Sequence, residues 1–184
     1  MNYEIEPLNS THIRKNFSCG KSILDDYIKI QASQDIRRKL STCFVLTDEK
    51  NNVIGYYTLS NTSIERAILP NEIIKKLPPS YKNLPATLLG RLAVDKNYFG
   101  RKLGEFLLID AMKKSVLVAK ENIGSMALIV DPIDEIAIAF YTKYGFILLP
   151  DSGKMFLPMQ TILPKIFLQK SARLLLLPLF DHNA

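Results

Sequence analysis

The second half of the chain alternates strand-like and helix-like segments, and this order restricts the fold more than any other feature. A β-prone run over residues 87–94 is followed by a helical apolar pattern over 102–120. A second β-prone run over 126–130 precedes another helical pattern, which ends at Gly145, a residue suited to a left-handed helix cap. Strand, helix and strand in this order place the two strands parallel in one sheet. The pattern therefore predicts an α/β or α+β domain.

The other segments add antiparallel strands and helices around this pair. In chain order we expect a helix over 20–39, a hairpin of strands 43–46 and 53–59, short helices and loops over 61–82, and final strands over 146–149 and 154–160. The prediction is a single domain with a mixed central β-sheet, antiparallel strands on its N-terminal side, and helices flanking the sheet.

Composition supports a soluble globular domain and suggests a class of partner. The chain has 184 residues, of which 47% are hydrophobic, enough for one domain with a full core. This composition excludes intrinsic disorder, collagen and disulfide scaffolds. With 24 Lys and Arg against 18 Asp and Glu, the net charge is +6. A basic domain favours polyanionic partners, nucleic acid first, although net charge also serves solubility alone.

Few residues are available for metal or membrane binding. The two cysteines and two histidines fit no zinc motif and no disulfide framework, so we expect no metal. The apolar run at 174–179 has six residues, far fewer than the about 20 that a membrane span needs. No secretory leader is recognisable at the N-terminus, and a cytoplasmic location is expected.

The segment 90–108 joins a strand to a helix through a basic turn that contains glycine. Gly100 and Gly104 allow the backbone to approach a ligand, and Arg101 and Lys102 place positive charge at the helix N-terminus. Such turns attract phosphate groups. The two common glycine patterns of nucleotide-binding loops are absent, and a tight turn without a ligand is the simpler interpretation of the spacing alone.

The sequence Arg91-Leu-Ala-Val-Asp95 followed by this turn resembles the acetyl-CoA loop of GNAT-superfamily N-acetyltransferases. The family motif is Q/R-x-x-G-x-G/A, preceded by a splayed parallel strand. Gly104 matches its last position, whereas Phe99 and Lys102 replace the first residue and the usual fourth glycine. Lys102 either crowds the pyrophosphate or binds it. The resemblance implies acetyl-CoA binding by Leu92, Ala93, Val94, Phe99, Gly100, Arg101, Lys102, Leu103, Gly104 and Phe140, with a backbone N–H of 92–94 facing the acetyl oxygen.

Residues 131–146 resemble a second family segment, A-x-x-F-Y-x-x-x-G-F. The matching positions are Ala137, Phe140, Tyr141, Gly145 and Phe146. The resemblance implies that Tyr141 is catalytic and protonates the departing CoA thiolate, which a phenol with a pKa of about 10 can do. On helical spacing alone, Phe140 and Tyr144 also fit an aromatic stripe that faces the core.

The N-terminal segment 17–27 resembles the F-x-[SC]-G-x-x-x-L-D-x-[WY] opening of GNAT-type toxins from bacterial toxin–antitoxin pairs. The resemblance covers residues 3 to about 168, so the acetyltransferase domain is expected over 1–168. The tail 169–184 has no counterpart and is expected to pack on the domain or on a second subunit. Family members acetylate the α-amino group of aminoacyl-tRNA and block translation. The resemblance further implies an antitoxin of ribbon-helix-helix type and a homodimer.

Charge distribution gives separate support for a nucleic-acid substrate. Residues 11–40 hold seven basic and three acidic residues, 7 − 3 = +4 of the net +6. Arg37, Arg38 and Lys39 end the expected helix, which suits either a phosphate backbone or the helix dipole. With Arg91 they are the candidate tRNA-binding residues. No general base is evident, and an α-amino group, with a pKa of about 8, hardly needs one.

Two further hypotheses remain open. A GNAT enzyme acting on a small amine or a protein N-terminus shares every feature except the basic helix end. A non-catalytic GNAT-like module that binds nucleic acid or a partner is compatible with Phe99 and Lys102 in the phosphate loop.

Overall fold

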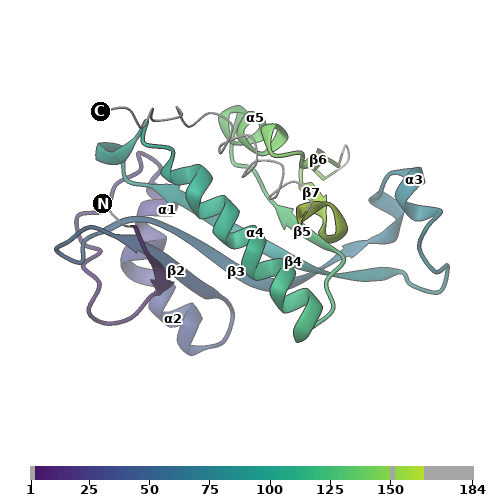
Figure 1. Cartoon of the computed structure of the whole chain (residues 1–184), viewed down its shortest axis with the longest axis horizontal. Helices are drawn as coiled ribbons and strands as arrows, with labels where there is room; N and C mark the ends of the chain where they lie inside the picture. Colours follow the sequence, from purple (N-terminus) through teal and green to yellow (C-terminus); the bar gives the residue numbers. More distant parts are fainter. Residues whose placement is uncertain (1–2, 150–151, 164–184) are drawn as a thin grey trace, which may run out of the picture.

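The protein folds around one mixed β-sheet, which helices cover on both faces (Figure 1). The computed structural model describes residues 3–149 and 152–163. Within them the strand order is β1-β2-β3-β4-β5-β7-β6, and the pair β4–β5 alone is parallel. The strands are β1 (Ile5–Pro7), β2 (Thr42–Thr47), β3 (Val53–Glu65), β4 (Asn83–Val94), β5 (Ala127–Val130), β6 (Ile147–Leu148) and β7 (Met155–Pro158). The predicted mixed sheet with one parallel pair is confirmed.

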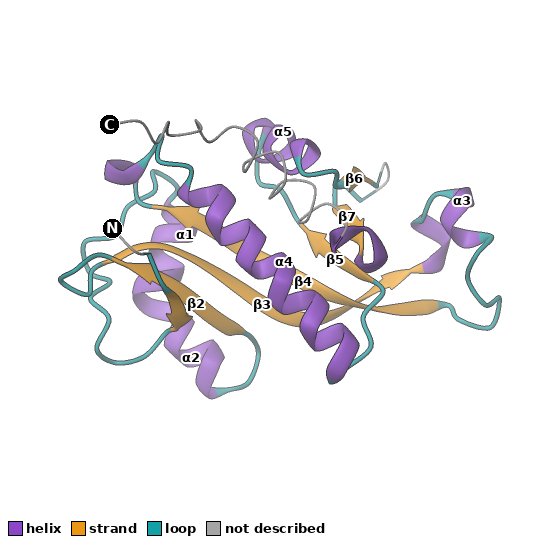
Figure 2. Ribbon diagram, viewed as in Figure 1, coloured by secondary structure: helices purple, strands orange, loops and turns teal. Residues whose placement is uncertain are grey.

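The helix expected over 20–39 consists of three consecutive segments, α1 (Ser22–Asp26), η1 (Tyr27–Gln31) and α2 (Ala32–Arg37). The middle segment is a π-helical turn, closed by a bond from the Ala32 N–H to the Tyr27 carbonyl. The other labelled helices are η2 (Arg66–Ile68), α3 (Asn71–Ile74), η3 (Lys96–Tyr98), α4 (Leu103–Glu121) and α5 (Glu135–Lys143), and residues 159–163 after β7 are also helical (Figure 2). Helix α4 confirms the helix predicted over 102–120.

The two faces of the sheet carry separate cores. Tyr56 and Tyr57 are neighbours on β3 and therefore point to opposite faces, and both are fully buried. Tyr57 packs in the cluster beneath α4, whereas Tyr56 packs with Phe17 and Tyr27 beneath α1 and η1. Both faces of β3 are thus shielded from water, and the helices on each side are held by large aromatic contacts.

One face of α4 is buried. Its buried residues are Leu103, Leu107, Leu108, Ala111, Met112, Ser115 and Val116, whereas Phe106 and Val118 are exposed. Helix α4 packs along β3 and β4, and its buried residues are those on the side that faces these two strands.

Strands β4 and β5 separate after a short paired stretch. Their register covers only three pairs, Thr87–Leu128 to Leu89–Val130, while β4 stays paired with β3 up to Val94. Gly90 is an extra residue at this point, because consecutive residues of β3 pair with Leu89 and Arg91. Such a bulge bends the strand and increases its twist. The splayed parallel pair that the resemblance implied is therefore present.

Strands β3 and β4 extend beyond the predicted ranges 53–59 and 87–94 and pair with each other. The two strands stay paired to Glu65 and Asn83, and with η2 and α3 they form an arm at one end of the molecule (Figure 1). The polar and proline-containing residues of 61–82 concealed this extension. Strand β1 was missed because it has three residues. No helix in the described ranges is long and apolar enough to cross a membrane.

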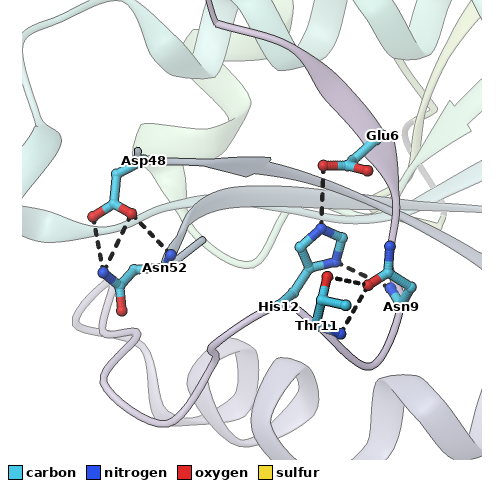
Figure 3. A network of polar contacts seen from close by, with 6 residues as sticks. All are labelled: Glu6, Asn9, Thr11, His12, Asp48 and Asn52. Atoms are coloured by element: carbon cyan, nitrogen blue, oxygen red, sulfur yellow. Dashed lines mark hydrogen bonds and ion pairs between the residues drawn. The ribbon is translucent and has the colours of Figure 1, made fainter. Parts of the chain in front are cut away.

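Two separate groups of polar contacts lie near β1 and in the β2–β3 turn (Figure 3). Buried His12 lies 3.2 Å from the Glu6 carboxylate through Nε2, and its Nδ1 accepts the Asn9 N–H at 3.0 Å. Asp48 accepts hydrogen bonds from the backbone and the amide of Asn52. These contacts assign His12 a structural role.

Candidate active site

A pocket of about 540 Å³ opens where β4 and β5 separate. Four parts of the chain line it: β4 beyond Leu89, the turn into α4, the start and inner face of α5, and the loop before α1. Its walls are mainly apolar, as in most small-molecule sites. The largest gap in the sheet pairing thus coincides with the basic turn singled out in the sequence.

Most of the predicted site residues meet in this pocket. Those that line it are Arg91, Leu92, Ala93, Val94, Phe99, Gly100, Lys102, Leu103, Gly104, Phe140 and Tyr141. Arg101 does not line it, because its guanidinium lies over the Tyr98 ring, 4.9 Å from the centroid. Cofactor binding by Arg101 therefore lacks support from the pocket geometry.

The turn into α4 exposes a helix N-terminus to the pocket. Lys102 is the N-cap residue and forms no side-chain cap bond, and the next residues, Leu103 and Gly104, line the cavity. The first N–H groups of a helix lack intrahelical partners and favour anions. The site can therefore bind phosphate groups through backbone N–H groups.

Two residues of this turn adopt left-handed backbone conformations. Gly100 has φ +79° and Lys102 has φ +59°. For a residue with a Cβ this conformation costs about 1 kcal/mol, which explains why the family motif has glycine at the position of Lys102. The Lys102 side chain is exposed. Gly104 lies beside Phe140 and Val94, since a Cβ there would approach each to 3.9 Å.

Tyr141 lies in the pocket wall opposite this turn. It is 7% exposed, packed between Phe140 and Phe146, and in the described part of the chain its hydroxyl forms no hydrogen bond. Burial raises its pKa well above the usual value, so the phenol stays protonated. Tyr144, also buried, lines the same pocket, and burial together with Glu105 raises its pKa to about 12.

The wall nearest α1 contains residues that sequence reasoning did not select. Cys19, Lys21 and Leu24 line the pocket, and the Lys21 ammonium lies 2.9 Å from the Asp134 carboxylate at the start of α5. The opening motif over 17–27 was recognised in the sequence. Its place in the pocket wall depends on long-range packing that a sequence pattern does not contain.

Arg91 and the basic helix end lie in different places. The Arg91 guanidinium stacks on the Tyr27 ring at 3.6 Å and lines the pocket. Exposed Arg37, Arg38 and Lys39 end α2 outside the pocket lining. There the Leu40 N–H bonds the Asp35 carbonyl and the Lys39 N–H bonds that of Ile36, a cap in which Lys39 has φ +60°. The cluster thus caps the helix and leaves its charges in solvent.

Comparison with known proteins matches this architecture. The family model of the acetyltransferase (GNAT) domain matches residues 39–148. A tRNA-acetylating toxin of Mycobacterium tuberculosis is 36% identical over 135 residues, 73% of this chain and 78% of the relative. The probable toxin TacT of Sinorhizobium fredii is 32% identical over 168 residues, 86% of this chain and 92% of the relative.

Solved structures show the same fold. A tyrosine-to-phenylalanine mutant of KacT superposes with a TM-score of 0.82 at 31% identity, covering 89% of this chain and 99% of that one. AtaT complexed with acetyl-methionyl-tRNAfMet has a TM-score of 0.81 at 30% identity, with 89% and 98% covered. AtaTR has also been solved with acetyl-CoA. The splayed sheet, the basic turn at the start of α4 and these matches together show that the chain belongs to the GNAT acetyltransferase family, among the relatives of its tRNA-acetylating toxins.

Proposed function

We propose that this protein transfers the acetyl group of acetyl-CoA to the α-amino group of an aminoacyl-tRNA and thereby acts as a toxin that blocks translation. The observation that carries the proposal is the single pocket in which the α4 N-terminus, the unpaired part of β4 and Tyr141 meet. The relatives named as tRNA-acetylating toxins, and AtaT in complex with acetylated tRNA, support the choice of substrate.

The donor fits the side of the pocket formed by β4 and α4. The N–H groups at the start of α4, with Gly100 and Gly104, suit the pyrophosphate of acetyl-CoA. The stretch Leu92–Val94 lies beyond the last β5 pair, so its backbone can bind the acetyl end. Phe140 closes the cavity beside Gly104.

Transfer requires one proton donor and an uncharged amine. The amine attacks the thioester carbon, a backbone N–H around Leu92–Val94 stabilises the oxygen that gains charge, and the carbon–sulfur bond breaks. Tyr141 donates its proton to the departing thiolate, which suits a phenol that burial keeps protonated. The attacking amine releases its proton to solvent.

The acceptor side of the pocket is suited to a nucleic-acid end. Arg91, held by its stack on Tyr27, presents a cation at the pocket, and Arg37, Arg38 and Lys39 present exposed cations at the end of α2. Guanidinium and ammonium groups placed in this way bind phosphates. We assign these four residues to tRNA binding.

The partners of the relatives suggest those of this chain. KacTA and AtaT–AtaR have been solved bound to DNA, and AtaT has been solved with the C-terminus of its antitoxin AtaR. We infer a cognate antitoxin, with a ribbon-helix-helix DNA-binding domain, and a homodimeric enzyme. The domain limit at residue 168 and the tail 169–184 fall outside the described residues and stay predictions, as does the cytoplasmic location.

The direct test is acetyl transfer from radiolabelled acetyl-CoA to a pool of charged tRNAs, with Tyr141→Phe as control. Label in the tRNA fraction that disappears in the variant supports both the chemistry and the substrate. Label on small amines but not on tRNA assigns the protein to the ordinary N-acetyltransferases. If neither tRNA nor small amines are acetylated, and calorimetry detects no binding of acetyl-CoA, the protein is assigned to the non-catalytic GNAT-like modules.

A further inference from the structure

Two buried carboxylates, Asp95 and Asp25, bond the loop before α1, part of which lines the pocket, and neither belongs to the machinery described above. Asp95 follows the splayed strand β4 and precedes the turn that leads to α4. Asp25 lies on α1, in the segment whose Cys19, Lys21 and Leu24 line the pocket; we call this part of the lining the acceptor wall. Because burying a carboxylate is costly unless it is well hydrogen bonded, the partners of both groups indicate what they hold.

Asp95 joins three parts of the chain. Its Oδ2 accepts the Ser18 N–H at 2.9 Å, and its Oδ1 accepts the Asn97 N–H at 2.9 Å at the start of η3. Its own N–H bonds the Ile54 carbonyl of β3 at 2.8 Å. The next N–H, that of Lys96, bonds the Ser18 carbonyl at 2.8 Å. The Asp95 side chain thus connects the loop before α1 to the turn of the donor site, while its backbone N–H holds this point to β3.

Asp25 holds the same loop from the other side. Its Oδ1 accepts the Cys19 N–H at 2.7 Å, and its Oδ2 accepts the Ser18 hydroxyl at 3.0 Å. Burial raises the pKa of Asp25, but these hydrogen bonds outweigh it and leave the pKa below its usual value, so the carboxylate is ionised. Ser18 and Cys19 are therefore fixed between two carboxylates.

The loop held in this way leads directly into the acceptor wall, while the turn held by Asp95 leads into the donor site. Cys19, Lys21 and Leu24 line the pocket on one side, and Phe99 and Gly100 line it on the other. We propose that Asp95 and Asp25 are positioning residues for acetyl transfer: together they set the acceptor wall at a fixed place relative to the acetyl-CoA loop. This inference rests on the proposed function, because it assigns the acceptor to this wall.

The two carboxylates have separable effects. Asp25 contacts only the acceptor-side loop, so Asp25→Ala raises the KM for aminoacyl-tRNA about 10-fold and leaves the Kd for acetyl-CoA within about 2-fold. Asp95 also caps η3 at the donor turn, so Asp95→Ala raises both constants, each by about 5-fold or more.

Asparagine variants distinguish a positioning role from a general loss of stability, because the two positions are expected to respond differently to the amide. Asp25 accepts from one N–H and one hydroxyl, and since a hydroxyl can also accept, Asp25→Asn satisfies both partners and restores the KM. Asp95 accepts from two backbone N–H groups, one through each oxygen. An asparagine amide has a single oxygen, so it accepts one of these N–H groups and turns its own NH2 group toward the other. Asp95→Asn therefore stays impaired.

The experiment measures the KM for charged tRNA, the Kd for acetyl-CoA by calorimetry, and Tm for all four variants. Asp48→Ala is the matched control, because Asp48 also accepts from two backbone N–H groups but in the β2–β3 turn, away from the pocket. The expected pattern is an acceptor-only defect for Asp25→Ala, rescued by Asn, and a double defect for Asp95→Ala. Variants that lower Tm without changing either constant overturn the inference. If the wild-type protein acetylates no tRNA, the proposed function is overturned instead. In that case the Kd for acetyl-CoA still tests the predicted role of Asp95 at the donor turn.

Discussion

Lys21 and Asp134 form a 2.9 Å ion pair that connects two sides of the pocket, although they lie 134 − 21 = 113 residues apart in the chain. Asp134 has a second role, since its Oδ1 accepts the Ala137 N–H at 2.8 Å and caps α5. That cap bond, and then the Lys21 ammonium, hold the pKa of Asp134 below its usual value. The two roles can be separated by substitution.

Loss of the cap is expected to destabilise the protein more than loss of the ion pair. Asp134→Ala removes both and lowers the free energy of unfolding. Asp134→Asn and Lys21→Ala remove the ion pair alone and lower the free energy of unfolding less, because the Lys21 side chain is 51% exposed and water screens the pair. Urea unfolding at pH 7 measures all three. Equal losses for Asp134→Ala and Lys21→Ala contradict this ranking.

The pH profile of transfer is expected to reflect the acceptor amine and not Tyr141. Burial raises the Tyr141 pKa, so its proton is retained throughout pH 6–10, whereas the α-amino group becomes neutral as pH rises through about 8. The acceptor kcat/KM should therefore rise with pH to a plateau and show no fall from phenol ionisation below pH 10. Steady-state rates across this range test the profile.

Tyr141→Phe is expected to lower that plateau at least about 100-fold without moving the rising limb. Tyr144→Phe is the matched control, because Tyr144 is also buried, also protonated and lines the same pocket. It should lose less than about 10-fold. A larger loss in Tyr144→Phe than in Tyr141→Phe transfers the proton-donor role to Tyr144.

The basic end of α2 is expected to contribute to tRNA binding through charge alone. Lys39 has a left-handed backbone conformation, which glycine adopts without steric cost, so Lys39→Gly removes the charge without destabilising the cap. The triple variant Arg37→Gln, Arg38→Gln, Lys39→Gly should raise the KM for tRNA and flatten its dependence on salt concentration.

Exposed Lys75 and Lys76, at the end of α3 on the arm, are the control for this triple variant. Their replacement by Gln should leave the KM and the salt slope nearly unchanged. Transfer to a small aminoacyl ester, which carries no phosphate chain, should be the same in both variants. An unaltered salt slope in the triple variant removes Arg37, Arg38 and Lys39 from the tRNA interface.

Lys102→Gly separates backbone strain from charge in the phosphate turn. Glycine adopts the φ of +59° without steric cost, so the variant should be more stable by about 1 kcal/mol. Because the Lys102 side chain is exposed and does not fill the turn, its loss should weaken acetyl-CoA binding about 3- to 10-fold. Thermal unfolding and calorimetry test the two effects. Tighter binding in the variant shows that the lysine crowds the pyrophosphate.

The parts of the fold that depend on local pattern were predictable. Strand β5 and helices α4 and α5 follow from apolar periodicity and from Gly145 at the end of α5, and the basic turn follows from its charge and glycines. The extension of β3 and β4 was not predictable, because polar residues and Pro85 interrupt its few apolar positions and it is held by cross-strand pairing. The acceptor wall was missed for a related reason: the loop that carries Cys19 is held by long-range hydrogen bonds such as that from Ser18 to Asp95, which a sequence pattern does not contain.

The bulge at Gly90 has a consequence for evolution under selection for stability. Closing the gap between β4 and β5 would add ladder hydrogen bonds and tighten the sheet, yet it would remove the only space in the described chain where the α4 N-terminus and Tyr141 meet. Variants in which regular strand pairing is restored at Gly90 should therefore be more stable than the wild type but inactive. A selection for survival of the host cell would enrich such variants among folded molecules, alongside those that merely unfold.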